Sequence, residues 1–191
     1  AGHPEIEISW TELGVRSGTL WASEIAQASY LTQLMAMIQG DDTADNIYQF
    51  NFVNPGLDND LKTGESHWGL LYDKSEITGP YAAKLSYLAM AGYNKLLSDV
   101  KPSGKIIKDK TSVYKFTRNS DGKDVIVLWT DNSYDNIGIN LGTKEVEVYD
   151  MYSNKTGDLK SEDGKYSFTT TFEPMYIVGN FSAFEECDPV I

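Results

Sequence analysis

The stretch Ile8-Ser9-Trp10-Thr11-Glu12-Leu13-Gly14 decides the fold expected for the first part of the chain. Its side chains alternate with a period of two residues, which predicts a β-strand over residues 5–12. That strand delivers the carboxylate of Glu12 to a turn at Gly14. Strands of parallel α/β barrels carry catalytic residues at this end, so Glu12 is the first candidate for a catalytic group. Trp10 should share its face and is a candidate for contact with a substrate.

A helix and a second strand are expected next. Ser23 is suited to be the N-cap of a helix that runs to about Ile38, with apolar residues at helical spacing. The strand over 47–52 has two faces, one aromatic and one carrying Gln49 and Asn51. In a barrel the aromatic face packs on helices and the amide face points into the lumen. Both amide residues are therefore candidates for substrate binding.

A long polar loop over 53–68 precedes the second helix, and long loops in compact domains are often functional. The loop ends at Trp68, whose ring is a further candidate for contact with a substrate. Pro80 fits the first position of a helix that should end near Asp99.

From Lys101 onward the pattern changes to short strands separated by turn residues, which is typical of an antiparallel sandwich. The expected class is therefore α/β plus all-β, with residues 1–100 in the first part and 101–191 in a β-sandwich. The strand over 124–130 is apolar on both faces and should be buried on both. Strands are expected at 104–109, 112–118, 124–130, 135–141, 145–151, 166–172 and 174–180.

Composition excludes some classes of function. The 191 residues carry a net charge of −12, which argues against partners such as nucleic acid or anionic membranes. The single cysteine, Cys187, cannot form an internal disulfide. His3 and His67 have no partners at metal-ligand spacing, so no metal site is expected. No phosphate-cradling glycine motif is present either, and no cofactor is expected.

The stretch that ends in Thr11-Glu12-Leu13-Gly14 resembles the seventh-strand motif of clan A glycoside hydrolases, with family 39 and family 5-like enzymes the nearest comparison. In that clan the strand ends in Thr-Glu-x-Gly and its glutamate is the nucleophile. The rest of the chain is similar in order. An eighth strand, a Trp68-Gly69-Leu70-Leu71 segment, a helix start at Pro80-Tyr81-Ala82 and an accessory β-sandwich follow.

The resemblance implies the last two β/α units of a (β/α)8 barrel in a retaining enzyme that cleaves O-glycosidic bonds of a poly- or oligosaccharide. Glu12 would be its nucleophile. The acid/base residue of the clan follows an Asn-Glu pair on the fourth strand, so it would lie in an upstream part of the protein. The expected partners are a carbohydrate substrate and that N-terminal part, and the chain alone is expected to be inactive. The expected location is secreted or cell-surface.

One departure from the family pattern leaves an alternative open. The eighth strand of such enzymes often carries a tryptophan under the sugar, and Gln49 stands at that position here. A non-catalytic carbohydrate-binding or cell-surface module with a degenerate barrel site would also explain this substitution.

Overall fold

The computed structural model describes residues 7–17, 23–55, 67–76 and 79–189. These residues form two compact units, Ala1–Met90 and Ala91–Ile191, which are considered separately below. The division falls inside helix α2 (Leu85–Leu97), earlier than the change in composition at Lys101. The domain limits of 1–100 and 101–191 stay a prediction. None of the described helices has the length and apolar character needed to cross a membrane.

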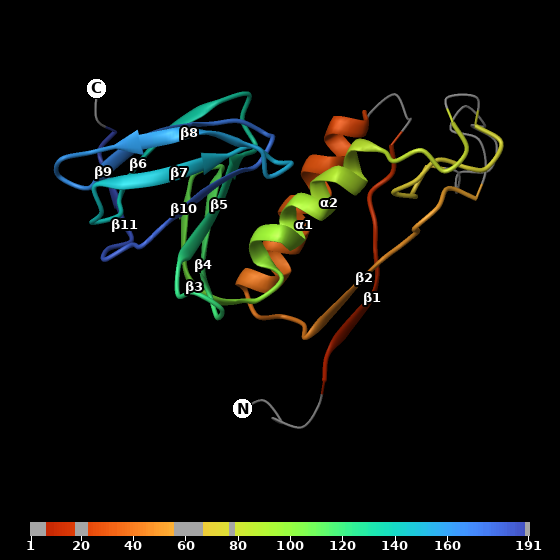
Figure 1. Cartoon of the computed structure of the whole chain (residues 1–191), viewed down its shortest axis with the longest axis horizontal. Helices are drawn as coiled ribbons and strands as arrows, with labels where there is room; N and C mark the ends of the chain where they lie inside the picture. Colours follow the sequence, from red (N-terminus) through yellow and green to blue (C-terminus); the bar gives the residue numbers. More distant parts are fainter. Residues whose placement is uncertain (1–6, 18–22, 56–66, 77–78, 190–191) are drawn as a thin grey trace. The chain divides into compact units, whose positions relative to one another are not determined.

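Unit 1 contains two parallel strands joined by a helix (Figure 1). Strand β1 (Ser9–Leu13) is followed by helix α1 (Glu24–Gly40) and strand β2 (Asn46–Gln49). Ser23 is the N-cap as predicted, since its Oγ accepts a hydrogen bond of 3.1 Å from the backbone N–H of Ala26. The helix ends at Gly40, slightly later than expected.

The parallel pair is open on both sides within the described part of the chain, where β1 and β2 pair only with each other. Parallel strands are normally buried on both faces, yet four of the five residues of β1 are exposed. Ten of the thirteen exposed large apolar side chains among the described residues belong to unit 1. They are Ile8, Trp10, Ile25, Tyr30, Met37, Tyr48, Phe52, Tyr81, Tyr87 and Leu88.

Two expectations for unit 1 are wrong in detail. The second strand ends at Gln49 rather than at Phe52. Of its expected aromatic face, Tyr48 is 55% exposed, and Phe52 meets the ring of Tyr87 in α2 edge-on with 6.4 Å between centroids. The second helix begins at Leu85 rather than at Pro80. Residues just before the helix instead make strand-like contacts. The backbone N–H of Lys84, for example, donates to the carbonyl oxygen of Leu70 at 2.9 Å.

Unit 2 is built from antiparallel strands in two sheets, which is compatible with the predicted β-sandwich (Figure 1). The larger sheet has the order β3-β4-β5-β10-β7-β8 and the smaller one β11-β6-β9. The strands are β3 (Val100–Lys108), β4 (Thr111–Arg118), β5 (Asp124–Thr130), β6 (Asp135–Asn140), β7 (Glu145–Tyr149), β8 (Lys155–Lys160), β9 (Lys165–Thr170), β10 (Met175–Gly179) and β11 (Glu185–Cys187).

One apolar core lies between the two sheets. Ile126 and Leu128 of β5 contribute to it from the larger sheet, and Ile137 and Phe168 contribute from the smaller one. On the other face of the larger sheet, the ring of Trp129 stacks on Tyr114 with 5.6 Å between centroids. All seven residues of β5 are buried, which confirms the prediction for this strand.

Two strands were not predicted. Residues 155–160 form the edge strand β8, in which every residue is exposed, so no apolar alternation marks it. The turn before it is formed by Asp150, whose carboxylate accepts from the backbone N–H groups of Tyr152 and Asn154. Strand β11 is a short edge strand of three residues.

Candidate active site at the end of the parallel strands

Glu12 lies at an irregularity in the parallel pair. Trp10 is paired with Ile47 and Leu13 with Gln49, so between these two pairs β1 contains one more residue than β2. The extra residue forms a bulge at Thr11 and Glu12, and bulges of this kind often re-aim a side chain beside an active site. The bulge interrupts the two-residue alternation, so spacing alone no longer places Trp10 and Glu12 on one face. Both side chains are exposed.

The turn after Glu12 packs closely on the end of β2. At Gly14 an added Cβ would overlap the carbonyl oxygen of Phe50 and lie 2.9 Å from Cε3 of Trp68. The backbone N–H of Phe50 also donates to the carbonyl oxygen of Leu13 at 2.7 Å. A side chain at position 14 would push these segments apart, which is the physical reason for glycine in the Thr-Glu-Leu-Gly run.

The structure brings two of the predicted site residues together, Gln49 and Trp68. The amide nitrogen of Gln49 donates to the backbone carbonyl of Phe50 at 2.8 Å and to that of Trp68 at 3.4 Å. Gln49 Oε1 and Trp68 Nε1 are both buried, and neither has a hydrogen-bond partner in the described part of the chain. Buried polar atoms are nearly always satisfied, so these two mark a place where further polar groups are needed.

The ring of Trp68 is surrounded by side chains at one corner of unit 1, where the ends of β1 and β2 meet the Trp68 segment. Phe50 meets it edge-on with 6.2 Å between centroids, and the guanidinium of Arg16 lies 6.0 Å from the ring centroid. Trp68 is therefore held in place by an aromatic contact and a cation–π contact.

Gln27 of α1 was missed by the sequence analysis and ties the loops of this corner together. Its amide nitrogen donates to the carbonyl oxygen of Val15 at 2.7 Å and to that of His67 at 3.2 Å. Its Oε1 accepts from the hydroxyl of Ser86 at 3.1 Å. Gln27 is one helical turn before the buried Leu31, so its place in the apolar stripe of α1 is the sequence signal that would have found it.

The carbonyl oxygen of His67 accepts hydrogen bonds from several donors, and Lys84 is one of them. The Lys84 side chain is fully buried, and its ammonium donates to Ser17 Oγ at 2.6 Å and to this carbonyl at 3.4 Å. The ammonium also lies 5.5 Å from the ring centroid of Tyr72. No periodic pattern in the sequence indicated a buried lysine here.

The other predicted residues lie near this corner with fewer contacts. The backbone carbonyl of Asn51 accepts from the N–H of Leu70 at 3.3 Å. Trp10 is 43% exposed and sits on β1 before the bulge. Among the described residues, no group of three or more His, Cys, Asp or Glu side chains is placed to hold a metal ion.

Comparisons with known proteins were made at the level of sequence and of structure. No protein-family model matches the chain, and a search of curated proteins found no significant match. Among solved structures, a family 39 glycoside hydrolase from the gut symbiont Bacteroides cellulosilyticus WH2 superposes with a TM-score of 0.73 at 21% identity. The match covers 91% of this chain and 34% of that one.

A second similar structure is CelM2, a bifunctional glucanase-xylanase protein from a metagenome library. It gives a TM-score of 0.60 at 14% identity, with 94% of this chain and 32% of that chain covered. The chain thus spans about a third of the length of the structures it matches. At these identities the likeness is one of fold, and it is a fold shared with part of each of two glycoside hydrolase structures.

Proposed function

We propose that this chain is the C-terminal part of a retaining glycoside hydrolase, with Glu12 as the nucleophile. The observation that carries the proposal is the position of Glu12, in a bulge at the C-terminal end of a strand with a parallel neighbour. Catalytic residues of parallel α/β barrels occupy such positions. The similar fold of the two glycoside hydrolase structures supports the same assignment.

In the proposed reaction the Glu12 carboxylate attacks the anomeric carbon and the glycosidic bond breaks, giving a covalent glycosyl-enzyme. A carboxylic acid from the upstream part of the protein protonates the leaving oxygen. The same group, now a carboxylate, then takes a proton from the water that releases the sugar and regenerates Glu12. Retention of configuration requires these two carboxyl groups to be about 5–5.5 Å apart.

We propose that the upstream part also completes a (β/α)8 barrel, of which β1 and β2 with their helices are the last two units. Three features of unit 1 support this. Both edges of the parallel pair are open within the described residues, many apolar side chains are exposed, and the buried Gln49 Oε1 and Trp68 Nε1 have no partners there. Strands added at both edges would satisfy the backbone groups and cover the apolar surface.

The substrate class follows from the same proposal. A cleft at this corner would present Trp68 together with the amides of Gln49 and Asn51 to a poly- or oligosaccharide, and Trp10 before the bulge would add a second ring. Sugar rings bring both apolar faces and hydroxyl groups to such a site. The proposed location of the complete enzyme is secreted or cell-surface.

The decisive experiment compares Glu12→Gln with Glu7→Gln in the complete protein. Glu7 lies just before β1, and its carboxylate accepts a hydrogen bond from the Asn46 amide, so the control makes the same chemical change without touching the strand end. We expect Glu12→Gln to lower kcat by on the order of a thousandfold or more, while the control retains activity. An activated 2-fluoro sugar should add its mass to the peptide that contains Glu12. Hydrolysis that survives Glu12→Gln would reject the nucleophile assignment.

A non-catalytic carbohydrate-binding or cell-surface module is the second candidate, and Gln49 is the residue that favours it. Its amide is held by the backbone carbonyls of Phe50 and Trp68, so it fixes a loop and offers no flat surface for stacking on a sugar. For such a module the complete protein would bind oligosaccharides without cleaving them, and Glu12→Gln would leave binding unchanged.

A further inference from the structure

A polar pocket of about 350 Å³ lies on the larger sheet of unit 2. Glu147 of β7 is paired with Asp158 of β8 and with Val178 of β10, and side chains of directly opposed residues share one face of a sheet. The neighbouring Val146 belongs to the core on the other face. The charged and amide side chains that line the pocket are Lys123, Glu145, Glu147, Lys155, Asp158 and Asn180.

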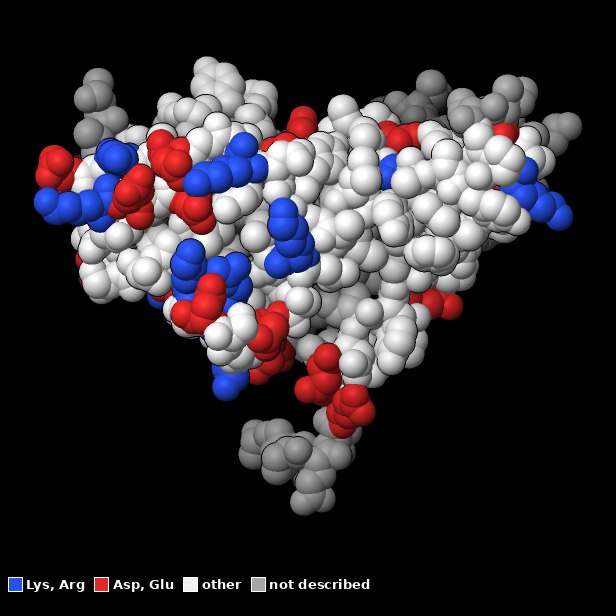
Figure 2. Space-filling model, in the orientation of Figure 1, with Lys and Arg blue, Asp and Glu red and all other residues white. Residues whose placement is uncertain are grey.

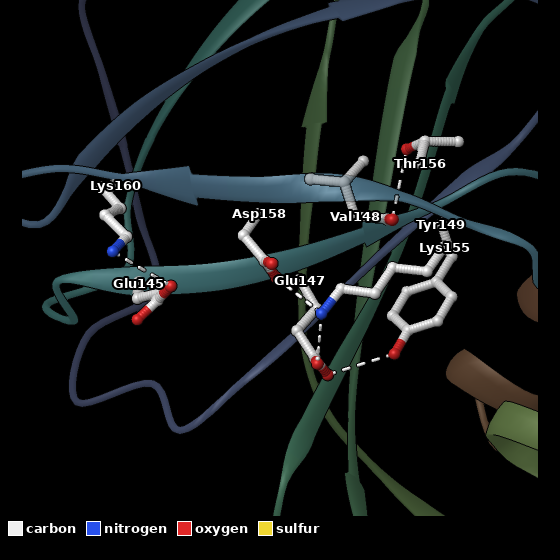
Figure 3. Close-up of polar contacts among 8 residues, drawn as sticks. All are labelled: Glu145, Glu147, Val148, Tyr149, Lys155, Thr156, Asp158 and Lys160. Atoms are coloured by element: carbon white, nitrogen blue, oxygen red, sulfur yellow. Dashed lines mark hydrogen bonds and ion pairs between the residues drawn. The ribbon is translucent and has the colours of Figure 1, made fainter.

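The charged groups of the pocket hold one another in place (Figure 3). The ammonium of Lys155 lies between two carboxylates, 2.8 Å from Glu147 Oε1 and 2.7 Å from Asp158 Oδ1. The hydroxyl of Tyr149 donates to the other oxygen of Glu147 at 3.1 Å. Charges of both signs also alternate over the surface where Figure 1 shows β7 and β8 (Figure 2).

Hydrogen-bonding capacity remains unfilled around this network. The Lys123 ammonium, the Thr143 hydroxyl and the Asn180 amide line the pocket and make no side-chain hydrogen bond to any residue that the structure describes. Each carboxylate oxygen can accept more than one bond, so Glu147 and Asp158 can accept further donors. The pocket therefore offers carboxylate acceptors that are held in place by Lys155 and Tyr149, beside donor groups that have no side-chain hydrogen bond among the described residues.

We propose that this pocket is a non-catalytic binding site for a neutral oligosaccharide. A sugar ring presents several hydroxyl groups that both donate and accept, which matches a wall of carboxylates, ammonium groups and an amide. Three carboxylates stand beside two lysines, so a charged ligand would always meet groups of its own sign. The volume lies at the lower end of the range for small-ligand sites, enough for a short stretch of a polysaccharide.

The choice of a saccharide rests on the proposed function, since a site here would hold a polymer that the catalytic unit cleaves. The test is made on the 191-residue chain, which needs no catalytic activity. Amide NMR spectra are recorded during titration with cellohexaose or xylohexaose, and in separate arms with trigalacturonate or pentalysine. We expect a dissociation constant in the millimolar range for the neutral sugars, with shifts confined to Lys123 and residues 143–147, 155–158 and 178–180.

Substitutions then assign the site. Glu147→Gln and Asp158→Asn should each weaken binding of the neutral sugar by about tenfold or more, because each removes a charged acceptor. The matched control is Glu162→Gln, since Glu162 forms an exposed ion pair with Lys144 outside the pocket and should leave binding unchanged. Shifts that map elsewhere, binding of pentalysine or trigalacturonate in preference to the neutral sugars, no binding at all, or equal losses in all three variants would overturn the proposal.

The two proposals can fail separately. Saccharide binding that depends on Glu147 in a protein whose hydrolysis ignores Glu12→Gln would keep the pocket and reject the nucleophile. Loss of hydrolysis in Glu12→Gln without any binding at Glu147 would do the reverse.

Discussion

The side-chain amide nitrogen of Gln27 lies 2.7 Å from the carbonyl oxygen of Val15, three residues after Glu12. This contact fastens the loop after β1 to helix α1. The same amide group also donates to the carbonyl of His67, and its oxygen accepts from Ser86. One buried side chain therefore connects the loop after β1, the Trp68 segment and helix α2.

The first prediction concerns this contact. Gln27→Leu fills a similar volume but leaves the Val15 carbonyl and the Ser86 hydroxyl without their partner. Each lost buried hydrogen bond should cost about 1–3 kcal/mol, so residues 13–17 and 67–70 should open more often. Hydrogen exchange measured by mass spectrometry reports this opening. Met37→Leu, at an exposed position of the same helix, is the control. Equal exchange in the two variants would contradict the role given to Gln27.

The second prediction concerns the close approach at Gly14. In Gly14→Ala the new methyl group would overlap the Phe50 carbonyl and crowd the Trp68 ring, at a cost of about 1–3 kcal/mol. Hydrogen exchange of β2 should accelerate, and the fluorescence of Trp68 should change. Gly157→Ala is the control, because no heavy atom lies within 4 Å of the added Cβ there. A Gly14→Ala protein as stable as the parent would show that the two segments can separate freely.

The third prediction tests the core between the two sheets. Leu128→Ala removes a fully buried side chain and should lower the free energy of unfolding of unit 2 by about 2–5 kcal/mol. Leu159→Ala makes the same change on β8, where the side chain is 40% exposed, and should cost less than about 1 kcal/mol. Urea unfolding followed by circular dichroism measures both. Similar losses in the two variants would argue against the core as described.

The fourth prediction concerns pH. The pKa of Glu147 is lowered from its usual value of 4.5, chiefly because the Lys155 ammonium donates a hydrogen bond to it, and the Tyr149 hydroxyl adds to the effect against an opposing contribution from burial. A carboxyl group with a lowered pKa in the folded state stabilises the fold above pH 4.5, and this contribution disappears as the pH falls through the folded-state pKa.

Removal of the ammonium should reverse this shift. In Lys155→Ala the pKa of Glu147 should rise toward 4.5, as followed by carbon-detected NMR of the side-chain carboxyl group. The pKa of Tyr149 is raised by burial and then by its hydrogen bond to Glu147, so the tyrosine should keep most of its shift in this variant. An unchanged Glu147 pKa in Lys155→Ala would rule out the ion pair as the main cause.

The strands of unit 2 show which elements a local sequence pattern can predict and which it cannot. The run Val125-Ile126-Val127-Leu128-Trp129 is apolar on both faces, and β5 is buried on both faces. Strand β8 lies at a sheet edge with all its residues exposed, so its sequence needed no apolar alternation and gave no signal. Its place is set by the backbone hydrogen bonds it makes with β7.

The candidate site also combines features that the sequence predicts with features that it does not. The sequence by itself determined that a strand ends near Glu12 and that Ser23 caps the helix, because alternation and capping are interactions between near neighbours along the chain. Only the tertiary structure decided that β1 bulges at Glu12, that Gln27 reaches the Val15 carbonyl and that Lys84 is buried. These features depend on backbone groups far away in the sequence, and no local period encodes which distant carbonyl a side chain will meet.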